Sequence, residues 1–295
     1  MAESGLIIVD KPGEWTSHDV VAKMRRIAGT RRVGHAGTLD PMATGVLVVG
    51  VEKATRLLGH LALTEKVYEA TMRLGVSTNT DDAEGEVVAT ASAAEVTEAE
   101  IRKGIAALTG EILQVPPQVS AIKVNGQRAY KAARAGEAVE LAARPVTVRS
   151  FEVLDVRRGR NTAGADVVDV DAVVTCSSGT YIRALARDLG AALGVGGHLT
   201  RLRRTRVGPY DLSLARSIEQ LAEECVVLPI GEAVAAAFPR RDVTAEEARV
   251  IGHGGRLPAA GLGKGPIGVF GPEGELLALV EEQGRVAKPL AVFVP

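Results

Sequence analysis

The stretch Arg31–Thr44 contains two glycines and an Asp40-Pro41 pair, and these residues constrain its backbone. Glycine adopts backbone conformations that other residues resist, and a proline disfavours the helical conformation in the residue before it. We therefore predict a loop over Arg31–Thr44, and strand character only from Val46 to Val51. Such a loop can hold the carboxylate of Asp40 on display, with Pro41 fixing the chain just beyond it.

Apolar residues elsewhere repeat with the periods of strands and helices. Leu6–Val9 predicts a buried strand, and Ser17 offers an N-cap for a helix with Val20, Val21, Met24 and Ile27 on one face. Further strands are predicted at Lys66–Leu74, Glu86–Thr90, Val146–Val156, Val167–Cys176 and Leu199–Val207, the first two of these as a pair. Further helices are predicted after a Thr97–Glu100 capping box, at Thr180–Leu193 and after a Ser217–Gln220 capping box.

The chain changes character near residue 230. A short helix with a Thr244–Glu247 capping box precedes three strands, predicted at Ile267–Phe270, Leu276–Glu281 and Ala287–Val294. Because 295 residues exceed what one core usually absorbs, we predict a large domain at 1–230 and a small β-rich domain at 231–295.

A second local signal suggests a projection from the large domain. Ser120–Val124 followed by Asn125-Gly126 predicts a hairpin, and a short basic helix is expected around Tyr130–Ala135. The segment at about residues 116–145 therefore reads as an insertion.

The formal net charge of −1 would argue against an RNA partner if charges were spread evenly. The charges are spread unevenly. The stretch from Arg183 to Arg206 contains six arginines and a single acid, Asp188, and a second basic stretch runs from Lys123 to Arg160. Acids gather around residues 81–86 and in the tail. On charge alone, these stretches fit phosphate contacts and solvated faces equally well.

The only cysteines, Cys176 and Cys225, are far apart in sequence and have no neighbouring histidine cluster, which argues against a disulfide framework or a zinc site. No apolar run is long enough for a signal-peptide core or a membrane span. We therefore expect a soluble cytoplasmic protein without a membrane partner. Nothing indicates an obligate protein partner, so a monomer is expected.

Several chemistries are disfavoured by missing motifs. The chain has no Walker spacing, no dinucleotide fingerprint opening a helix and no G-x-S-x-G elbow, and its five histidines show no metal-ligand spacing. An aspartate before a proline is also a common turn former, so spacing alone leaves two readings of Asp40 open, a turn residue or a displayed nucleophile.

Five motifs in register resemble those of the TruB family of tRNA pseudouridine synthases. The longest is Gly34-His35-Ala36-Gly37-Thr38-Leu39-Asp40-Pro41, and the others are Val9–Pro12, Lys66–Ala70, Pro117–Lys123 and Gly179–Arg183. The resemblance spans about residues 5–210. It implies the pseudouridine synthase fold, an α+β arrangement with a mixed, largely antiparallel central sheet and flanking helices, followed by a PUA-like C-terminal domain at 231–295.

The resemblance also implies roles for individual residues. Asp40 is the nucleophile that attacks an everted uridine, on the sugar or on the base ring, and Arg183 pairs with it. Tyr68 lies against the base and handles the proton that leaves carbon. His35 helps to hold the nucleotide out of its stack, Tyr181 helps to close the pocket, and Leu202 lines it.

By the same resemblance the partner is the T arm of tRNA, the product is pseudouridine at position 55, and neither a metal nor an organic cofactor is needed. The insertion at about 116–145 would grip the RNA and the tail would bind the far end of the tRNA. Two alternatives stay open: an RNA-binding or RNA-folding module with a structural Asp40 loop, and an enzyme of the same fold that acts on another RNA.

Overall fold

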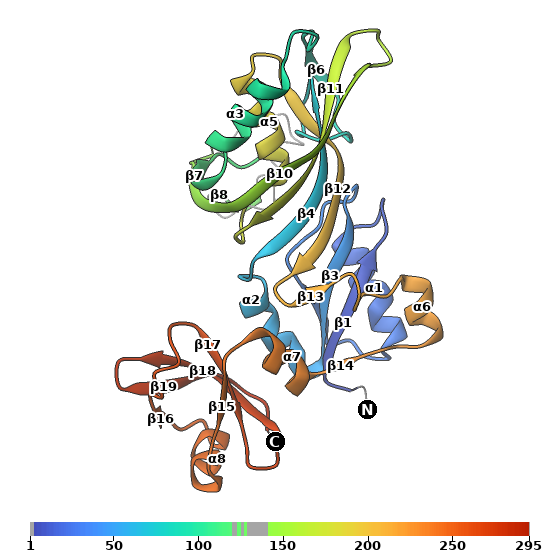
Figure 1. The fold of residues 1–295 in the computed structure, drawn as a ribbon. Coiled ribbons are helices and arrows are strands. Elements are labelled where there is room, and N and C mark those ends of the chain that lie inside the picture. Colours follow the sequence, from blue (N-terminus) through green and yellow to red (C-terminus); the bar gives the residue numbers. More distant parts are fainter. Residues whose placement is uncertain (1–2, 120–122, 125–126, 129–140, 295) are drawn as a thin grey trace. The chain divides into compact units, whose positions relative to one another are not determined.

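The computed structural model describes residues 3–119, 123–124, 127–128 and 141–294. The chain forms two compact units (Figure 1): unit 1 comprises residues 1–40, 45–63 and 207–295, and unit 2 comprises residues 41–44 and 64–206.

The first part of unit 1 is an antiparallel sheet built on a buried strand. Strand β1 (Gly5–Lys11) lies between β14 (Leu228–Pro229) and β3 (Thr44–Val51), antiparallel to both. Residues 6–9 of β1 are buried on both faces, as the run of apolar residues predicts.

The predicted loop at Arg31–Thr44 is wrong in its first part. Val33–Ala36 forms strand β2, which pairs antiparallel with β3. Gly34 lies opposite Gly50, and a Cβ at either position would come within about 3 Å of the Leu58 side chain. Gly34, which suggested a loop, and Gly50 thus make room for the short helices η1 (Glu52–Leu57) and α2 (Leu58–Leu61) beside the β2–β3 hairpin.

Helix α1 (Ser17–Ile27) buries Val20, Val21 and Met24, as its apolar face predicts. The predicted N-cap is wrong by one residue. Thr16 is the cap, and its hydroxyl accepts a hydrogen bond from the Asp19 backbone N–H while the Asp19 carboxylate accepts one from the Thr16 backbone. Ser17 is the first helical residue, so its hydroxyl is available for another contact.

The tail of unit 1 forms a five-stranded sheet in the order β15 (Arg240–Asp242), β17 (Pro266–Phe270), β18 (Leu276–Gln283), β19 (Val286–Val292) and β16 (Leu257–Pro258). The three predicted strands are β17, β18 and β19, and the predicted helix is α8 (Ala245–Gly252), capped by Thr244. The sequence did not indicate helix α7 (Ile230–Ala237).

The tail shares a hydrophobic core with the first part of unit 1. Phe270, Leu276 and Phe293 belong to the same buried cluster as Leu6 and Leu57. Two long side chains add polar contacts, because the Lys53 ammonium donates to the Phe293 carbonyl at 2.6 Å and the Arg56 guanidinium to the Val292 carbonyl at 2.7 Å. The predicted boundary near residue 230 falls where β14 meets α7.

Unit 2 is a five-stranded sheet in the order β12 (Gly197–Val207), β4 (Lys66–Leu74), β11 (Asp166–Cys176), β10 (Arg144–Arg160) and β7 (Gly110–Gln114). The pairs β4–β11, β10–β11 and β7–β10 are antiparallel. The predicted strand at Lys66–Leu74 matches β4 at both ends. The predicted pairing of this strand with Glu86–Thr90 is wrong, since β6 (Val87–Thr90) pairs with the short β5 (Val76–Thr78).

Among the described residues of unit 2, two helices pack against each other. Helix α3 (Glu98–Ala107) begins at the predicted Thr97–Glu100 capping box, and α5 (Ile182–Ala192) carries an apolar face. Helix α3 contacts both α5 and β10, and Gly104 leaves room for the Leu189 side chain of α5. Helix α6 (Ile218–Glu223), in unit 1, begins at the predicted Ser217–Gln220 box.

The two strands that flank the predicted Asn125-Gly126 turn are present. Strand β8 (Lys123–Val124) pairs antiparallel with β9 (Gln127–Arg128). The predicted basic helix around Tyr130–Ala135 lies outside the described residues.

Among the described residues, no helix has both the length and the apolar character needed to cross a bilayer.

Replacing Gly190 with alanine should destabilise the protein, because α5 leaves no space there for a methyl group. A Cβ at this position would lie 2.2 Å from the backbone carbon of Gly196 and 2.3 Å from the Gly197 nitrogen. Backbone cannot rotate away as a side chain can, so we expect a loss of about 3 kcal/mol or more. The midpoint of urea unfolding measures this loss of stability. The control is Gly159→Ala, where an added Cβ would have no atom within 4 Å, and an equal loss of stability in both variants would contradict the packing argument.

Candidate active site

Asp40 lies in the turn of the β2–β3 hairpin, which residues 37–43 connect. Two glycines at its ends have positive φ, 77° at Gly37 and 99° at Gly45, so side-chain-bearing residues would be strained there. The Asp40 side chain is partly buried, whereas Leu39 beside it is 3% exposed. The loop predicted around Asp40 is therefore present, as the connection between the paired strands β2 and β3.

The residue before Asp40 is held by a side chain from α1. The Ser17 hydroxyl accepts a hydrogen bond from the Leu39 N–H at 3.0 Å and donates one to the Leu39 carbonyl at 3.2 Å. Ser17 is 1% exposed, so water does not compete for either bond. Sequence reasoning assigned Ser17 to the N-cap and missed this contact. The Thr16–Asp19 capping-box spacing was the signal that Ser17 itself was not the cap.

His35 is on β2, in the same unit as Asp40, and opposite Val49 in the register with β3. Its ring meets that of His18 from α1 edge to face, with ring centroids 5.7 Å apart. The start of α1 therefore contacts both the loop and His35.

Arg183 is a buried residue of α5 in unit 2. Its guanidinium lies 3.3 Å from the Asp82 carboxylate, and the side chains are only 5% and 4% exposed. It also donates to the carbonyls of Thr80 at 2.8 Å and Val119 at 2.9 Å. A buried ion pair needs such additional hydrogen bonds to offset the cost of removing both ions from water. Asp40 lies in unit 1, so its expected pairing with Arg183 stays a prediction.

Arg187, one turn further along α5, repeats the arrangement. It lies 3.1 Å from the Asp81 carboxylate and 2.9 Å from Asp188, and it donates to the Val115 carbonyl at 2.7 Å. Burial raises the pKa of Asp81, and the opposing effect of Arg187 is smaller. The two arginines thus hold the turn at Asp81 and Asp82 against α5.

Tyr181 is the N-cap residue of α5, and its backbone is held by a buried amide. The Gln114 side chain accepts from the Tyr181 N–H at 2.8 Å and donates to the Tyr181 carbonyl at 3.1 Å. Gln114 is 2% exposed and ends β7, just before the chain enters the predicted insertion. The sequence gave no reason to single out Gln114 or Asp82, because each acts through a partner distant in sequence.

Tyr68 is on β4, opposite Val174 of β11, and is 7% exposed. Leu202 is on β12, the strand next to β4, and is 6% exposed. Lys66 precedes Tyr68 by two residues on the same face of β4 and donates to the Thr64 carbonyl at 2.9 Å. Burial, and secondarily the nearby Arg204, lower the pKa of Lys66 to about 8.

Several arginines of the basic stretch between Arg183 and Arg206 are already engaged in ion pairs within the protein. Besides the ion pairs of Arg183 and Arg187 on α5, Arg206 lies 2.8 Å from Glu65 and Arg201 lies 3.5 Å from Glu69. Arg204 is only 1% exposed. Acids distant in sequence thus neutralise part of the charge that a count along the stretch assigns to phosphate binding.

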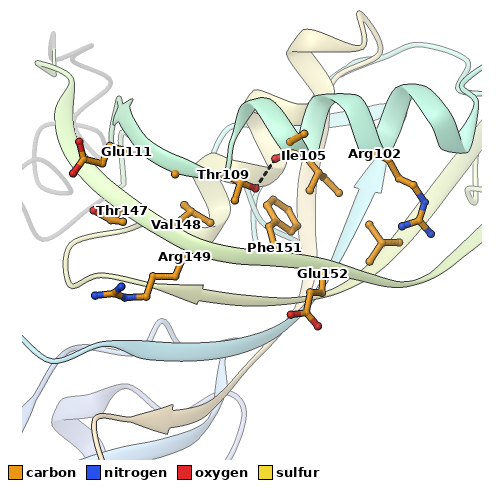
Figure 2. Close-up of a pocket in the computed structure, with 12 residues that line it drawn as sticks. Arg102, Ile105, Thr109, Glu111, Thr147, Val148, Arg149, Phe151 and Glu152 are labelled. Atoms are coloured by element: carbon orange, nitrogen blue, oxygen red, sulfur yellow. Dashed lines mark hydrogen bonds between the residues drawn. The ribbon is translucent and has the colours of Figure 1, made fainter.

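A hollow of about 940 Å³ opens in unit 2 between α3, β7 and β10, away from the six residues expected in the site. Figure 2 shows Ile105, Val148 and Phe151 lining it and the Thr109 hydroxyl bonded to the Ile105 carbonyl. Its rim carries Arg102 and Arg149 but also Glu111 and Glu152. The hollow therefore lacks the excess positive charge that a phosphate backbone requires.

In the part of the chain that the structure describes, no three His, Cys, Asp or Glu residues are grouped so as to hold a metal ion. Cys176 and Cys225 are free thiols. Burial raises the pKa of Cys176 to about 11, so this thiol is an unreactive core residue rather than a nucleophile.

Comparison with solved structures and families defines the class. The structure titled "Crystal Structure of a Cbf5-Nop10-Gar1 Complex" contains a chain with a TM-score of 0.75 and 29% identity, over 99% of this chain and 85% of that one. "Structure of H/ACA RNP bound to a substrate RNA containing 2'-deoxyuridine" gives a TM-score of 0.73 and 28% identity, over 99% and 85%. The expected α+β pseudouridine synthase fold, with its small C-terminal β-sheet domain, is thereby confirmed.

The family follows from the sequence matches. Residues 25–182 match the N-terminal domain of TruB family pseudouridylate synthases, residues 183–233 match the tRNA pseudouridylate synthase B C-terminal domain, and residues 238–294 match the C-terminal region of tRNA pseudouridine synthase II. The chain belongs to the TruB family of pseudouridine synthases, and it is an isomerase.

Relatives match over nearly their whole length. The tRNA pseudouridine synthase B of Thermobifida fusca is 65% identical over 289 residues, 98% of each chain. That of Streptomyces avermitilis is 64% identical over 291 residues, 98% of this chain and 97% of the other.

The buried ammonium of Lys66 should make stability depend on pH. Its pKa is about 8 in the folded chain and near 10.5 when unfolded, so the unfolded chain binds more protons between these values and stability rises with pH across that window. The rise is up to about 3 kcal/mol over the whole window. Urea midpoints at pH 7.5 and 9.5 should increase more for the native chain than for Lys66→Met. Parallel changes in both would contradict the burial argument.

Proposed function

We propose that this enzyme isomerises a uridine in the T loop of tRNA, at position 55, to pseudouridine. The observation that carries the proposal is the match to tRNA pseudouridine synthases B along nearly the whole chain, with Asp40 in the connection between the paired strands β2 and β3. The N-glycosidic bond between uracil and ribose breaks, the base turns, and a carbon–carbon bond to the ribose forms. Product and substrate are isomers, so the reaction needs no external oxidant or reductant.

Asp40 is the proposed nucleophile. A carboxylate can bond covalently to the nucleotide and split one difficult step into two easier ones. The loop geometry supports this role because the backbone just before Asp40 is fixed by Ser17, and a fixed backbone limits the positions that the carboxylate samples. The resemblance leaves attack on the sugar and attack on the base ring both open.

Arg183 and Tyr68 complete the proposed chemistry. A cation beside Asp40 would keep its carboxylate ionised and aimed, and the contacts of Arg183 with Asp82 and two carbonyls would keep that cation in one orientation. Tyr68 would lie against the base and handle the proton that leaves carbon when the new bond forms.

Three residues are proposed to bind the everted nucleotide. His35 would help to hold it out of its stack, Tyr181 would help to close the pocket, and Leu202 would line the base pocket. The fixed backbone of Tyr181 and the buried position of Leu202 suit residues that define a shape.

The proposed partner is the T arm of tRNA, gripped by the insertion at about 116–145. We further propose two domains, 1–230 for catalysis and 231–295 as a PUA-like module that binds the far end of the tRNA. A monomer without an obligate protein partner, a metal or an organic cofactor is proposed, in the cytoplasm, where free thiols persist.

Asp40→Asn should abolish product formation and leave tRNA binding intact, because the amide is nearly isosteric but is not a nucleophile. We expect the single-turnover rate on an unmodified tRNA transcript to fall at least about 1,000-fold, with the dissociation constant for tRNA within twofold. Glu14→Gln, which removes an exposed carboxylate from the same unit, is the control and should keep the native rate. Product made by the Asn variant would reject the nucleophile assignment, and an RNA-binding module predicts no product from either protein.

The modified position is tested by chemical mapping. Purified enzyme incubated with unmodified total RNA should produce one carbodiimide-dependent reverse-transcription stop in the T loop of tRNAs, at position 55. The alternative of another RNA substrate is kept open by the structural neighbour whose title names a substrate RNA in an H/ACA particle. A stop outside the T loop would reject the proposed substrate while leaving the isomerase assignment in place.

A further inference from the structure

Ser17 makes a contact beside the proposed nucleophile that no sequence motif explains. One buried hydroxyl binds both polar groups of a single residue, the N–H and the carbonyl of Leu39. Two bonds to one residue fix its rotation as well as its position. The Leu39 side chain is also buried, at 3% exposure, so this residue is held through its backbone and its side chain.

The hydroxyl of Ser17 is not needed to start α1. Thr16 and Asp19 already form a complete capping box there. The preceding turn is fixed separately, because the buried Lys11 ammonium donates to the carbonyls of Pro12 at 2.9 Å and Trp15 at 2.6 Å. The start of α1 is thus a firm support, and Ser17 uses it to hold the loop rather than the helix.

Leu39 and Asp40 are joined by one peptide bond, so their Cα atoms are about 3.8 Å apart. Fixing the peptide groups of Leu39 therefore limits where the Asp40 carboxylate can lie. The next fixed point is Gly37, whose positive φ already sets the direction in which the chain enters the loop. Ser17 restricts the segment between Gly37 and Asp40 at Leu39.

We infer that Ser17 is a positioning residue for Asp40, acting through the backbone of Leu39. This inference rests on the proposed function, because it matters for the reaction only if Asp40 is the nucleophile. Misplacing a reacting group by about 1 Å can cost about 100-fold in rate. Loss of the hydroxyl should therefore slow the chemical step and leave RNA affinity unchanged.

The test compares two variants at adjacent positions of the intact chain. Ser17→Ala removes both bonds to Leu39, and the matched control Thr16→Ala removes the cap of the same helix without touching Leu39. We measure the single-turnover rate of pseudouridine formation on a tRNA transcript, the dissociation constant for that tRNA, and the melting temperature. Ser17→Ala should lower the rate about 10- to 100-fold with the dissociation constant within twofold. Thr16→Ala should lower the melting temperature and keep the rate within about twofold.

Two results would overturn the inference. One is a Ser17→Ala rate within twofold of the native rate, and the other is equal loss of rate in both variants, which would mean that Ser17 serves only stability. Should Ser17→Ala not fold, Ser17→Cys replaces it, since a thiol keeps the volume but is a weak hydrogen-bonding group. A Ser17→Cys rate within twofold of the native rate would likewise overturn the inference.

Asp40→Asn in the same assay separates this inference from the proposed function. An inactive Asp40→Asn with a fully active Ser17→Ala rejects only the role of Ser17. An active Asp40→Asn rejects both, because the residue that Ser17 is inferred to position would then not be the nucleophile.

Discussion

Two ion pairs of α5, the buried pair Arg183–Asp82 and the partly exposed pair Arg187–Asp81, hold the turn at Asp81 and Asp82 against the helix that carries Arg183. Arg183 and Arg187 face Asp82 and Asp81, and their remaining donors reach backbone carbonyls, including those of Val115 and Val119. Burying the charges of Arg183 and Asp82 costs several kcal/mol per ion unless geometry and hydrogen bonds compensate. The compensation requires that the 78–85 turn, α5 and the chain leaving β7 keep one arrangement. Arg183, the proposed active-site cation, gains a fixed orientation from the same requirement.

In unit 1, the segments around Asp40 are held in one arrangement by closely packed backbone rather than by ion pairs. Gly34 and Gly50 let the β2–β3 hairpin lie against Leu58, and Gly37 and Gly45 let the connection turn tightly. One buried hydroxyl from α1 then fixes Leu39. Glycine supplies the shape at a cost in conformational entropy, and the hydrogen bonds of Ser17 restrict the freedom that glycine leaves.

Local signals predicted most of the elements correctly and failed where a distant partner decided the outcome. The capping boxes at Thr97, Ser217 and Thr244 are present because cap and partner are three residues apart. The apolar alternation of β4 likewise appears with its predicted ends. Strand β2 was missed because its glycine, Gly34, suits close packing as well as a turn. Strand β6 was given the wrong neighbour because strand pairing is not encoded within either strand.

The sequence alone determined most of the segments that become helices and strands, the loop that carries Asp40, and the family, whose motifs stand in order along the chain. Only the tertiary structure decided which charges are neutralised and which backbone groups are held. Arg183 reads as a surface helix residue until Asp82 is folded against it, and Ser17 reads as a cap until Leu39 meets it. The physical reason is that periodicity and capping act within one or two turns of chain, whereas burial and hydrogen bonding of these groups depend on residues brought together only when the chain closes.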